Sequence, residues 1–262
     1  MEPYYQDDFV TLYNDDCLNV LPHLSGIDLI FTSPPYNLGN TTGGGFPGNG
    51  NYARTASLGS RGGSGKWGGG DLANGYDDHD DDLPHADYVE WQKRVVRECW
   101  LSLAPNGAIF YNHKPRVLGG VLVTPFSYLP DDLPVRQIVI WARAGGFNFS
   151  PTFYVPTHEW IVVIAKPLWR LKSKAASGVG DVWYVPQVSD TEHPAPFPLG
   201  LPARAIESTD AMLVCDPFAG SGTTLRAAKD AGVKAIGIEK SERYCDMAVR
   251  RLGQESLFGG VA

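Results

Sequence analysis

Short apolar runs alternate with amphipathic helical patterns along most of this chain, and this alternation constrains the fold most strongly. Runs with the length and composition of strands occupy 9–13, 27–32, 108–111, 135–141, 160–164, 211–215 and 233–238. Helical periodicity covers 17–24, 86–103, 223–230 and 242–252. The pattern predicts an α/β fold with an open, mostly parallel, twisted sheet and helices on both of its faces.

One segment interrupts the alternation. Residues 37–70 hold 13 of the 30 glycines in the chain of 262 residues. A segment of this composition and length is expected to form a flexible loop, either functional or disordered. We therefore expect one domain over 1–262, with a flexible glycine-rich loop inserted at 37–85.

Composition excludes several classes of protein. The chain is 43% hydrophobic and 19% charged, as soluble globular proteins are. Its apolar stretches are far shorter than the roughly 20 residues that span a bilayer, and the acidic N-terminus lacks the positive region of a signal peptide. The four cysteines show no CxxC spacing and are expected to be buried free thiols. We expect a cytoplasmic protein without a membrane segment or a metal site.

The segment LVCDPFAGSGTT at 213–224 carries the strongest local signal. An apolar strand runs into Asp216, Gly220 and Gly222 let the backbone approach a ligand, and a helix follows. Glu239 ends the next strand, where an acidic residue can bind the ribose hydroxyls of a nucleotide-like ligand. The dinucleotide pattern and the GK[ST] phosphate loop are both missing from the sequence. By itself the turn could be only a tight turn, but the whole pattern predicts a cofactor with a ribose and no pyrophosphate.

A second motif, SPPY at 33–36, follows the C-terminal end of a buried strand, where open α/β sheets bind their ligands. The two prolines stiffen the backbone and lack N–H groups, Ser33 adds a hydroxyl, and Tyr36 adds a flat ring. This combination suits a planar group that carries an amine. A proline-rich strand exit without a binding role is the alternative.

Together these motifs resemble those of the DNA amino-methyltransferases, which transfer a methyl group from S-adenosylmethionine to adenine N6 or cytosine N4. The SPPY motif resembles the catalytic tetrapeptide of this family, and 216–224 resembles its cofactor loop. The tetrapeptide comes first here, which resembles the order of the β class. The resemblance implies a circularly permuted, Rossmann-like class I methyltransferase fold with an inserted target-recognition segment, for which 166–192 is the candidate.

The resemblance also implies roles for individual residues. Catalysis is assigned to Ser33, Pro34, Pro35 and Tyr36. The implied contacts of the S-adenosylmethionine are made by Asp16, Cys17, Phe197, Asp216, Phe218, Gly220, Ser221, Gly222, Thr223 and Glu239. Among them, Asp16 matches the acidic residue near the cofactor adenine, and Phe197 matches the lining of the methionine end.

The chemistry of the target group suggests a mechanism. An exocyclic amine is a poor nucleophile because its lone pair is delocalised into the ring. If the Ser33 side chain and the Pro34 carbonyl accept its two hydrogens and Tyr36 stacks on a base flipped out of the duplex, the lone pair can point at the methyl donor. Serine in the first motif position favours cytosine N4 over adenine N6, although serine also occurs with adenine. An RNA or protein amino-methyltransferase and a catalytically silent DNA-binding module are the alternatives.

The charge distribution bears on the partner. The net charge of −7 by itself disfavours nucleic acid, yet residues 136–174 carry +5 and are interleaved with aromatic side chains. We expect double-stranded DNA as the partner, contacted by Lys114, Arg116, Arg143, Lys166, Arg170, Lys172 and Lys174. The resemblance also implies a place in restriction-modification and is compatible with a homodimer.

Overall fold

The computed structural model describes residues 1–37, 83–143, 145, 151–187 and 197–254, and the structural statements below refer to these. Most of the predicted glycine-rich loop, 38–82, lies outside the described residues. The same holds for 188–196, which include the end of the predicted target-recognition segment.

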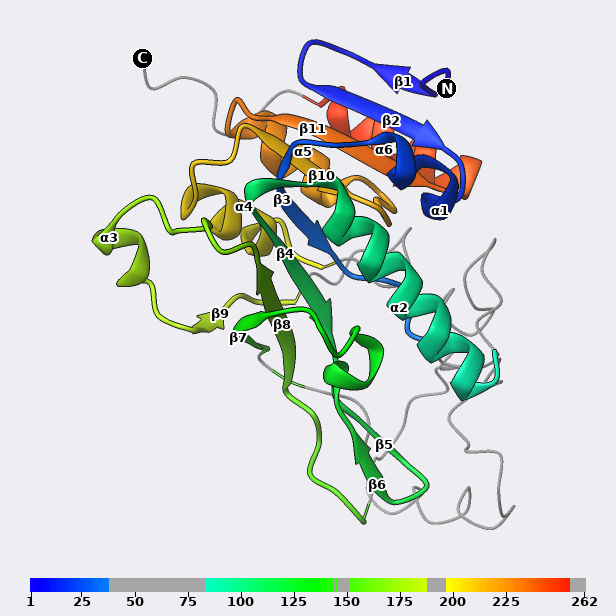
Figure 1. Cartoon of the computed structure of the whole chain (residues 1–262), viewed down its shortest axis with the longest axis vertical. Helices are drawn as coiled ribbons and strands as arrows, with labels where there is room; N and C mark the ends of the chain where they lie inside the picture. The colour runs from blue at the N-terminus through cyan, green and yellow to red at the C-terminus, as the bar shows by residue number, and fades with distance from the viewer. Residues whose placement is uncertain (38–82, 144, 146–150, 188–196, 255–262) are drawn as a thin grey trace, which may run out of the picture.

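A nine-stranded sheet runs through the molecule in the order β1-β2-β11-β10-β3-β4-β8-β7-β9 (Figure 1). The five central strands are parallel to one another: β2 (Val10–Asn14), β11 (Lys234–Glu239), β10 (Leu213–Asp216), β3 (Ile27–Thr32) and β4 (Leu103–His113). Outside this parallel centre, β1 (Tyr5–Gln6) pairs antiparallel with β2, and β8 (His158–Ala165) pairs antiparallel with β4. Beyond β8 follow the antiparallel β7 (Val135–Ala142) and, parallel to β7, the short β9 (Val182–Tyr184).

Helices cover both faces of the sheet (Figure 1). One face packs against α1 (Cys17–Val20), the 3-10 turn η1 (Leu21–His23), α2 (His85–Ser102) and the 3-10 turn η4 (Pro125–Tyr128). The other face packs against α4 (Gly200–Glu207), α5 (Thr223–Asp230) and α6 (Glu242–Leu252). A further helix, α3 (Lys174–Ser177), precedes β9, and a small hairpin pairs β5 (Arg116–Leu118) with β6 (Val121–Val123).

The middle of strand β3 shows why a central strand is apolar without alternation. Leu29 and Phe31 belong to the core under α4 and α5, whereas Ile30 between them belongs to the core under α2. Successive side chains of a strand point to opposite faces, so both faces of a strand that has helices on both sides favour apolar residues along its middle. This two-sided burial is the physical source of the pattern in the sequence.

The predicted architecture is confirmed, since the sheet is mostly parallel and helices lie on both faces. The antiparallel strands β8 and β7 make it a mixed sheet. All four cysteines are buried free thiols, as predicted. Within the part of the chain that the structure describes, no helix has both the length and the apolar character needed to cross a bilayer.

Candidate active site

The strand order brings the predicted site residues to one edge of the sheet. Parallel neighbours have their carboxyl ends at the same edge, and open α/β sheets bind ligands there. The residues at or just beyond these ends, in spatial order, are Asp16 after β2, Glu239 in β11, Asp216 in β10, Ser33 after β3 and Asn112 in β4. The two predicted motifs, far apart in the sequence, are therefore on adjacent strands, because β10 pairs with β3.

Asp216 holds both ends of the glycine loop, residues 217–222 between β10 and α5. Its side chain is fully buried, and its two oxygens accept hydrogen bonds from the Phe218 backbone N–H at 3.1 Å and the Thr224 hydroxyl at 2.6 Å. Burial raises the pKa of this carboxyl to about 6. The sequence predicts that Asp216 binds the cofactor, and the structure shows it holding the loop that follows β10.

The loop itself needs glycine for two reasons. Gly220 and Gly222 have φ of 48° and 80°, in the left-handed region that side chains disfavour. A Cβ on Gly222 would also lie 2.9 Å from the Cβ of Ala248 in α6. Ser221 and Thr223 are buried at the start of α5, and Arg251 Nη1 donates to the Thr223 hydroxyl at 2.5 Å.

Glu239 closes the loop from the neighbouring strand. Its two carboxylate oxygens accept hydrogen bonds from the backbone N–H groups of Gly220 at 2.8 Å and Ser241 at 2.9 Å. The side chain is only partly exposed, and burial raises its pKa to about 7. Each oxygen keeps a lone pair beyond its single backbone donor, so this carboxylate can still accept hydrogen bonds from a ligand.

Asp16 and Cys17 lie at the outer end of the row. Asp16 caps α1 by accepting a hydrogen bond from the Leu18 backbone N–H at 2.9 Å, and its Oδ2 lies 3.8 Å from Lys240 Nζ. Its side chain is 36% exposed, whereas Cys17 is buried and burial raises the pKa of its thiol. Asp16 is therefore the accessible member of the two.

Two aromatic rings supply the apolar contacts of this region. The Phe218 ring lies 5.6 Å from that of Trp91 in α2, and the Phe197 ring lies 5.4 Å from that of Phe31 in β3. Both phenylalanines are partly exposed. Phe31 is two residues before Ser33, so Phe197 contacts the strand that leads into the tetrapeptide.

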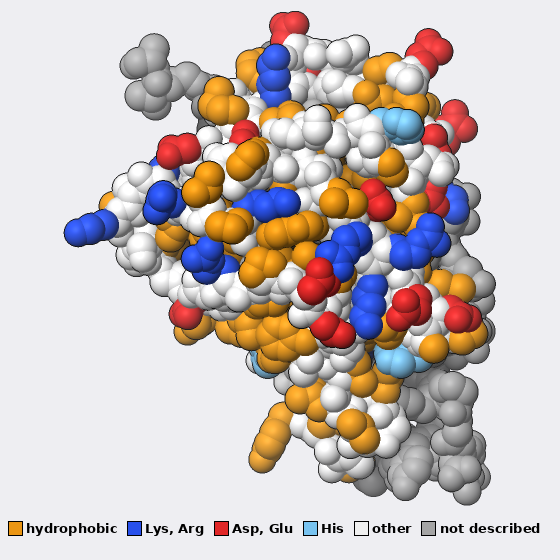
Figure 2. Space-filling view, in the orientation of Figure 1, with side chains coloured by type: hydrophobic (Ala, Val, Ile, Leu, Met, Phe, Trp, Pro, Cys, Tyr) orange, Lys and Arg blue, Asp and Glu red, His pale blue; other side chains and the backbone are white. Residues whose placement is uncertain are grey.

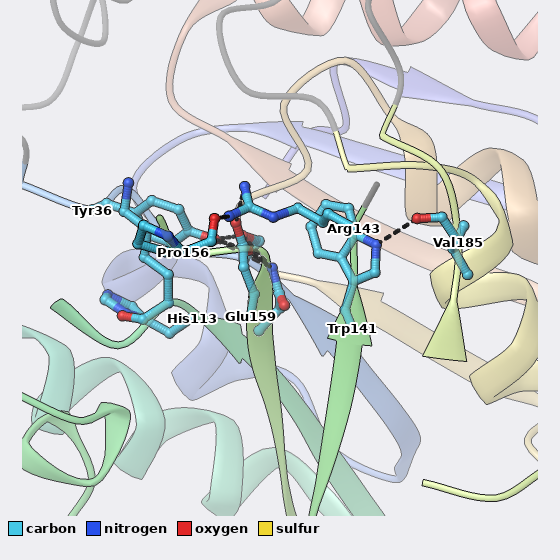
Figure 3. A network of polar contacts seen from close by, with 10 residues as sticks. Tyr36, His113, Trp141, Arg143, Pro156, Glu159 and Val185 are labelled. Carbon is cyan, nitrogen blue, oxygen red and sulfur yellow. Dashed lines mark hydrogen bonds and ion pairs between the residues drawn. The ribbon is translucent and has the colours of Figure 1, made fainter. Parts of the chain in front are cut away.

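The tetrapeptide is built into a hydrogen-bonded cluster that the sequence did not predict. Ser33 Oγ lies 3.0 Å from the Tyr36 hydroxyl, which donates to Glu159 Oε2 at 2.9 Å (Figure 3). Asn112 Nδ2 lies within 3.2 Å of the same three groups. Arg143 Nη1 is 3.2 Å from Glu159 Oε1. Strands β4 and β8 thus each contribute a side chain that contacts Ser33 or Tyr36, and Arg143, directly after β7, pairs with Glu159 behind them.

Strand direction explains why Glu159 reaches this place. β8 is antiparallel to β4, so the beginning of β8 lies at the edge where the parallel strands end. Glu159 is the second residue of β8 and is 5% exposed. In the sequence it is the lone acid in a basic stretch. A single carboxylate at the start of an apolar strand is the signal that could have found it.

A second polar cluster supports the tetrapeptide from the inside. The buried Tyr88 hydroxyl of α2 donates to the Pro35 carbonyl at 2.7 Å and lies 3.0 Å from His113 Nε2. Gln92 Nε2 donates to the same hydroxyl at 2.9 Å. Burial lowers the pKa of His113 to about 3, so this imidazole is neutral near pH 7. His113 therefore acts here as a buried, neutral hydrogen-bonding residue that supports the tetrapeptide through Tyr88.

The residues predicted to bind DNA fall into separate groups. Lys114 Nζ lies 5.2 Å from the centre of the Tyr36 ring, and Arg116 Nη1 donates to the Asn37 carbonyl at 3.1 Å, so both are at the edge of the tetrapeptide. Arg143 is instead turned inward: its side chain is 13% exposed and engaged with Glu159 and with the Pro156 carbonyl. Because the guanidinium already has two partners within the protein, one of them the buried Glu159, its contact with DNA stays a prediction that would require these contacts to change.

The remaining basic residues lie at the opposite edge of the sheet. The Lys166 backbone N–H donates to the Gly107 carbonyl, and Lys172 N–H donates to the Ser208 carbonyl. Gly107 precedes Asn112 by five residues of strand β4, about 17 Å along the sheet. Figure 2 shows basic side chains around α3 and mixed charges over α2. This group of basic residues therefore lies far from the tetrapeptide; its members are Lys166, Arg170, Lys172 and Lys174.

Comparison with known proteins agrees with this geometry. The family model described as DNA methylase, of the N6/N4 type, matches residues 27–250. The Type II methyltransferase M.ScaI of Streptomyces caespitosus is 26% identical over 98% of this chain and 86% of its own length. M.BglII of Bacillus subtilis is 24% identical over 93% of this chain and 69% of its own length.

Solved structures show the same fold. The cytosine-N4-specific PvuII DNA methyltransferase has a TM-score of 0.69 at 18% identity, over 98% of this chain and 90% of that chain. A protein of Thermus thermophilus described as a DNA modification methylase, solved with S-adenosyl-L-methionine, has a TM-score of 0.61 at 21% identity, with 92% of each chain covered. Because the family match extends over most of the sequence, this chain belongs to the N6/N4 DNA methylase family and is an S-adenosylmethionine-dependent DNA amino-methyltransferase.

Proposed function

We propose that this protein transfers a methyl group to the N4 of a cytosine that is flipped out of double-stranded DNA. The observation that carries the proposal is that Ser33 and Tyr36 directly follow β3, the strand next to that of Asp216, with Glu239 one strand further. A methyl donor held at β10 and β11 would meet an amine held after β3. The printed specificity of the PvuII enzyme and the serine at position 33 favour cytosine N4 over adenine N6.

The residues at the ends of β10 and β11 suit the cofactor. Glu239 is a partly exposed carboxylate whose remaining lone pairs can accept the two ribose hydroxyls. Asp16 can accept from the adenine amino group, while Phe197 and Phe218 offer apolar surface. When bound, S-adenosylmethionine supplies a methyl group that its positive sulfur makes electrophilic.

The chain's own part in the reaction is to bind and orient the target amine. Ser33 Oγ and the Pro34 carbonyl are the proposed acceptors of its two N–H hydrogens. Two hydrogen bonds of this kind draw the nitrogen toward tetrahedral geometry and free its lone pair. Holding the amine in this pose supplies orientation that the reaction in solution would have to find by chance.

Base stacking on Tyr36 requires a rearrangement. The Tyr36 side chain is 8% exposed, its ring is 4.7 Å from that of His113, and Lys114 Nζ lies over it. We propose that Lys114 moves from the ring to a DNA phosphate when the base enters. Lys114 and Arg116 would then form the contact surface for DNA around the site. A role for 166–192 in target recognition and assembly as a homodimer both stay predictions.

The test is methyl transfer to DNA from a host without methylation. Labelled cofactor, purified protein and this DNA are combined, and the nucleosides are then separated by mass spectrometry. We expect N4-methylcytosine, and we expect Ser33→Ala and Tyr36→Ala to lose methyl transfer while cofactor binding stays within about threefold. N6-methyladenine would overturn the choice of base. Label found only in RNA or protein, or unchanged activity in both variants, would overturn the proposed function.

A further inference from the structure

The buried cluster around Glu159 has a fixed direction of hydrogen bonding. A carboxylate only accepts hydrogen bonds, so both the Tyr36 hydroxyl and the Asn112 amide must donate to Glu159. The Tyr36 hydroxyl has a single hydrogen, and this hydrogen goes to Glu159. In the 3.0 Å contact between Ser33 and Tyr36, Ser33 must therefore be the donor.

This direction decides what Ser33 offers to a ligand. Its hydrogen goes to Tyr36, and one lone pair of Oγ accepts from Asn112 Nδ2 at 3.2 Å. A hydroxyl oxygen has two lone pairs, so one more remains to accept a hydrogen bond. Without the anion at position 159, the Ser33 hydrogen could instead point at the incoming amine, where it would oppose an N–H group.

Arg143 gives the cluster its second anchor. Its guanidinium pairs with Glu159 Oε1, the oxygen that Tyr36 and Asn112 leave free, and it also donates to the Pro156 carbonyl at 3.1 Å. With side-chain exposures of 7% for Glu159 and 13% for Arg143, the pair is well shielded from water. A buried carboxylate without such a partner would be costly.

We infer that Glu159 is a positioning residue for methyl transfer, acting through Tyr36 and Asn112 to keep Ser33 Oγ as a hydrogen-bond acceptor for the target amine. The inference rests on the proposed function and adds a residue outside the tetrapeptide to it. Glu159 touches neither the base nor the cofactor in this assignment. Its effect should therefore appear in kcat and depend on the Tyr36 hydroxyl.

A double-mutant cycle tests this dependence. Wild type, Glu159→Gln, Tyr36→Phe and the double variant are compared by kcat, by KM for DNA and by the cofactor dissociation constant. We expect Glu159→Gln to lower kcat about 10- to 100-fold, with cofactor affinity within about twofold. In the Tyr36→Phe background the same change should cost at most about threefold, because the hydroxyl that it orients is gone. Glu159→Asp, which keeps the charge, should recover part of kcat.

Several outcomes would overturn the inference. They are a wild-type kcat in Glu159→Gln, an equal loss in both backgrounds, or a loss of cofactor affinity as large as the loss of kcat. Asp132→Asn, which removes an exposed partner of Arg97, is the control and should keep wild-type kcat. If Glu159→Gln does not fold, Glu159→Gln with Arg143→Gln removes both charges and takes its place in the cycle. A wild type that methylates no DNA defeats the proposed function itself, and the inference with it.

Discussion

Two carboxylates at the same edge of the sheet, the buried Glu159 and the partly exposed Glu239, are held in different ways. Glu159, beside the tetrapeptide, has three side-chain partners, and one of them is the guanidinium of Arg143. Glu239, beside the glycine loop, accepts from two backbone N–H groups. Among the described residues, no Lys or Arg forms an ion pair with Glu239. The two environments give the same chemical group different tasks.

The difference divides the site into two parts. Around Glu159 the polar groups are paired within the protein, and around Glu239 a carboxylate can still accept hydrogen bonds from a ligand. Glu159 is satisfied within the protein, which suits a group that orients its neighbours. Glu239 has a raised pKa of about 7 because burial is not offset by a cation. Hydroxyl groups of a ligand would supply the hydrogen bonds that this carboxylate lacks. The tetrapeptide is thus held by side-chain charge, and the glycine loop by backbone hydrogen bonds and glycine geometry.

The largest effect is expected when the charge on the tetrapeptide side is broken. Arg143→Met leaves Glu159 as a buried anion without a cation, and removing one partner of such a pair costs about 3–5 kcal/mol. Urea unfolding at pH 8 measures the loss. As a control, Arg97→Met removes an exposed pair with Asp132 and should cost at most about 1 kcal/mol. Equal losses in the two variants would show that Glu159 does not depend on Arg143.

On the cofactor side, glycine geometry is the part to break. Gly222→Ala forces a Cβ at φ 80° and places it 2.9 Å from Ala248 Cβ, with an expected cost of about 2–4 kcal/mol. Gly180→Ala is a matched control, because Gly180 has φ 77° and no atom lies within 4 Å of its added Cβ. It should cost about 1–2 kcal/mol. Urea unfolding gives both values, and no difference between them would contradict the role of the Ala248 contact.

The sequence predicts the parallel centre of the fold well, because each of its strands is an apolar run of useful length. The sequence does not predict short elements such as β9 and α4. β9 has three residues and is held by its neighbour β7, with Trp141 Nε1 donating to the Val185 carbonyl at 2.8 Å. Helix α4 begins at Gly200 and contains Pro202, which are weak helix formers. Such elements depend on tertiary contacts that periodicity does not contain.

The site divides in the same way. Ser33, Asp216 and Glu239 stand in motifs whose spacing carries a chemical meaning, so the sequence locates them. Glu159 reaches the tetrapeptide because β8 runs antiparallel to β4, and Asn112 reaches it because β4 runs parallel to β3; strand direction and order are properties of the folded sheet. Lys166 is the opposite case. Its basic stretch predicts contact with DNA, but Lys166 follows the last residue of β8 and lies at the edge of the sheet opposite the tetrapeptide.

The next prediction concerns the pH dependence of cofactor binding at Glu239. If the ionised form of Glu239 binds the ribose hydroxyls, a pKa of about 7 makes cofactor affinity fall on acidification. The expected loss is about tenfold from pH 8 to pH 6 and about 100-fold at pH 5. Equilibrium binding of S-adenosylmethionine measures it. Glu239→Gln should bind more weakly with a flatter profile, whereas Glu159→Gln should keep the wild-type slope.

The same raised pKa fixes the sign of a stability effect in the ligand-free protein. The group's pKa is about 7 when folded and 4.5 in its ordinary range, so the folded state binds more protons between these values. The raised pKa therefore adds to the free energy of unfolding at low pH. This contribution is complete below pH 4.5 and is lost as the pH rises through 7. Asp216, with a pKa of about 6, acts in the same direction.

A cofactor affinity that does not change with pH would assign the ribose contact to another residue.

The smallest effects extend the comparison from charges to neutral hydroxyls. Tyr88 is fully buried, and its hydroxyl holds the Pro35 carbonyl at 2.7 Å. Tyr88→Phe should therefore cost about 1–2 kcal/mol in urea unfolding and slow methyl transfer. The equally buried Tyr128 hydroxyl has no hydrogen-bond partner among the described residues. Tyr128→Phe should leave stability unchanged or raise it, because it removes a buried polar atom that gains nothing from folding. A loss in Tyr128→Phe as large as that in Tyr88→Phe would mean that the volume filled by the buried hydroxyl, and not its hydrogen bond, accounts for the loss in Tyr88→Phe.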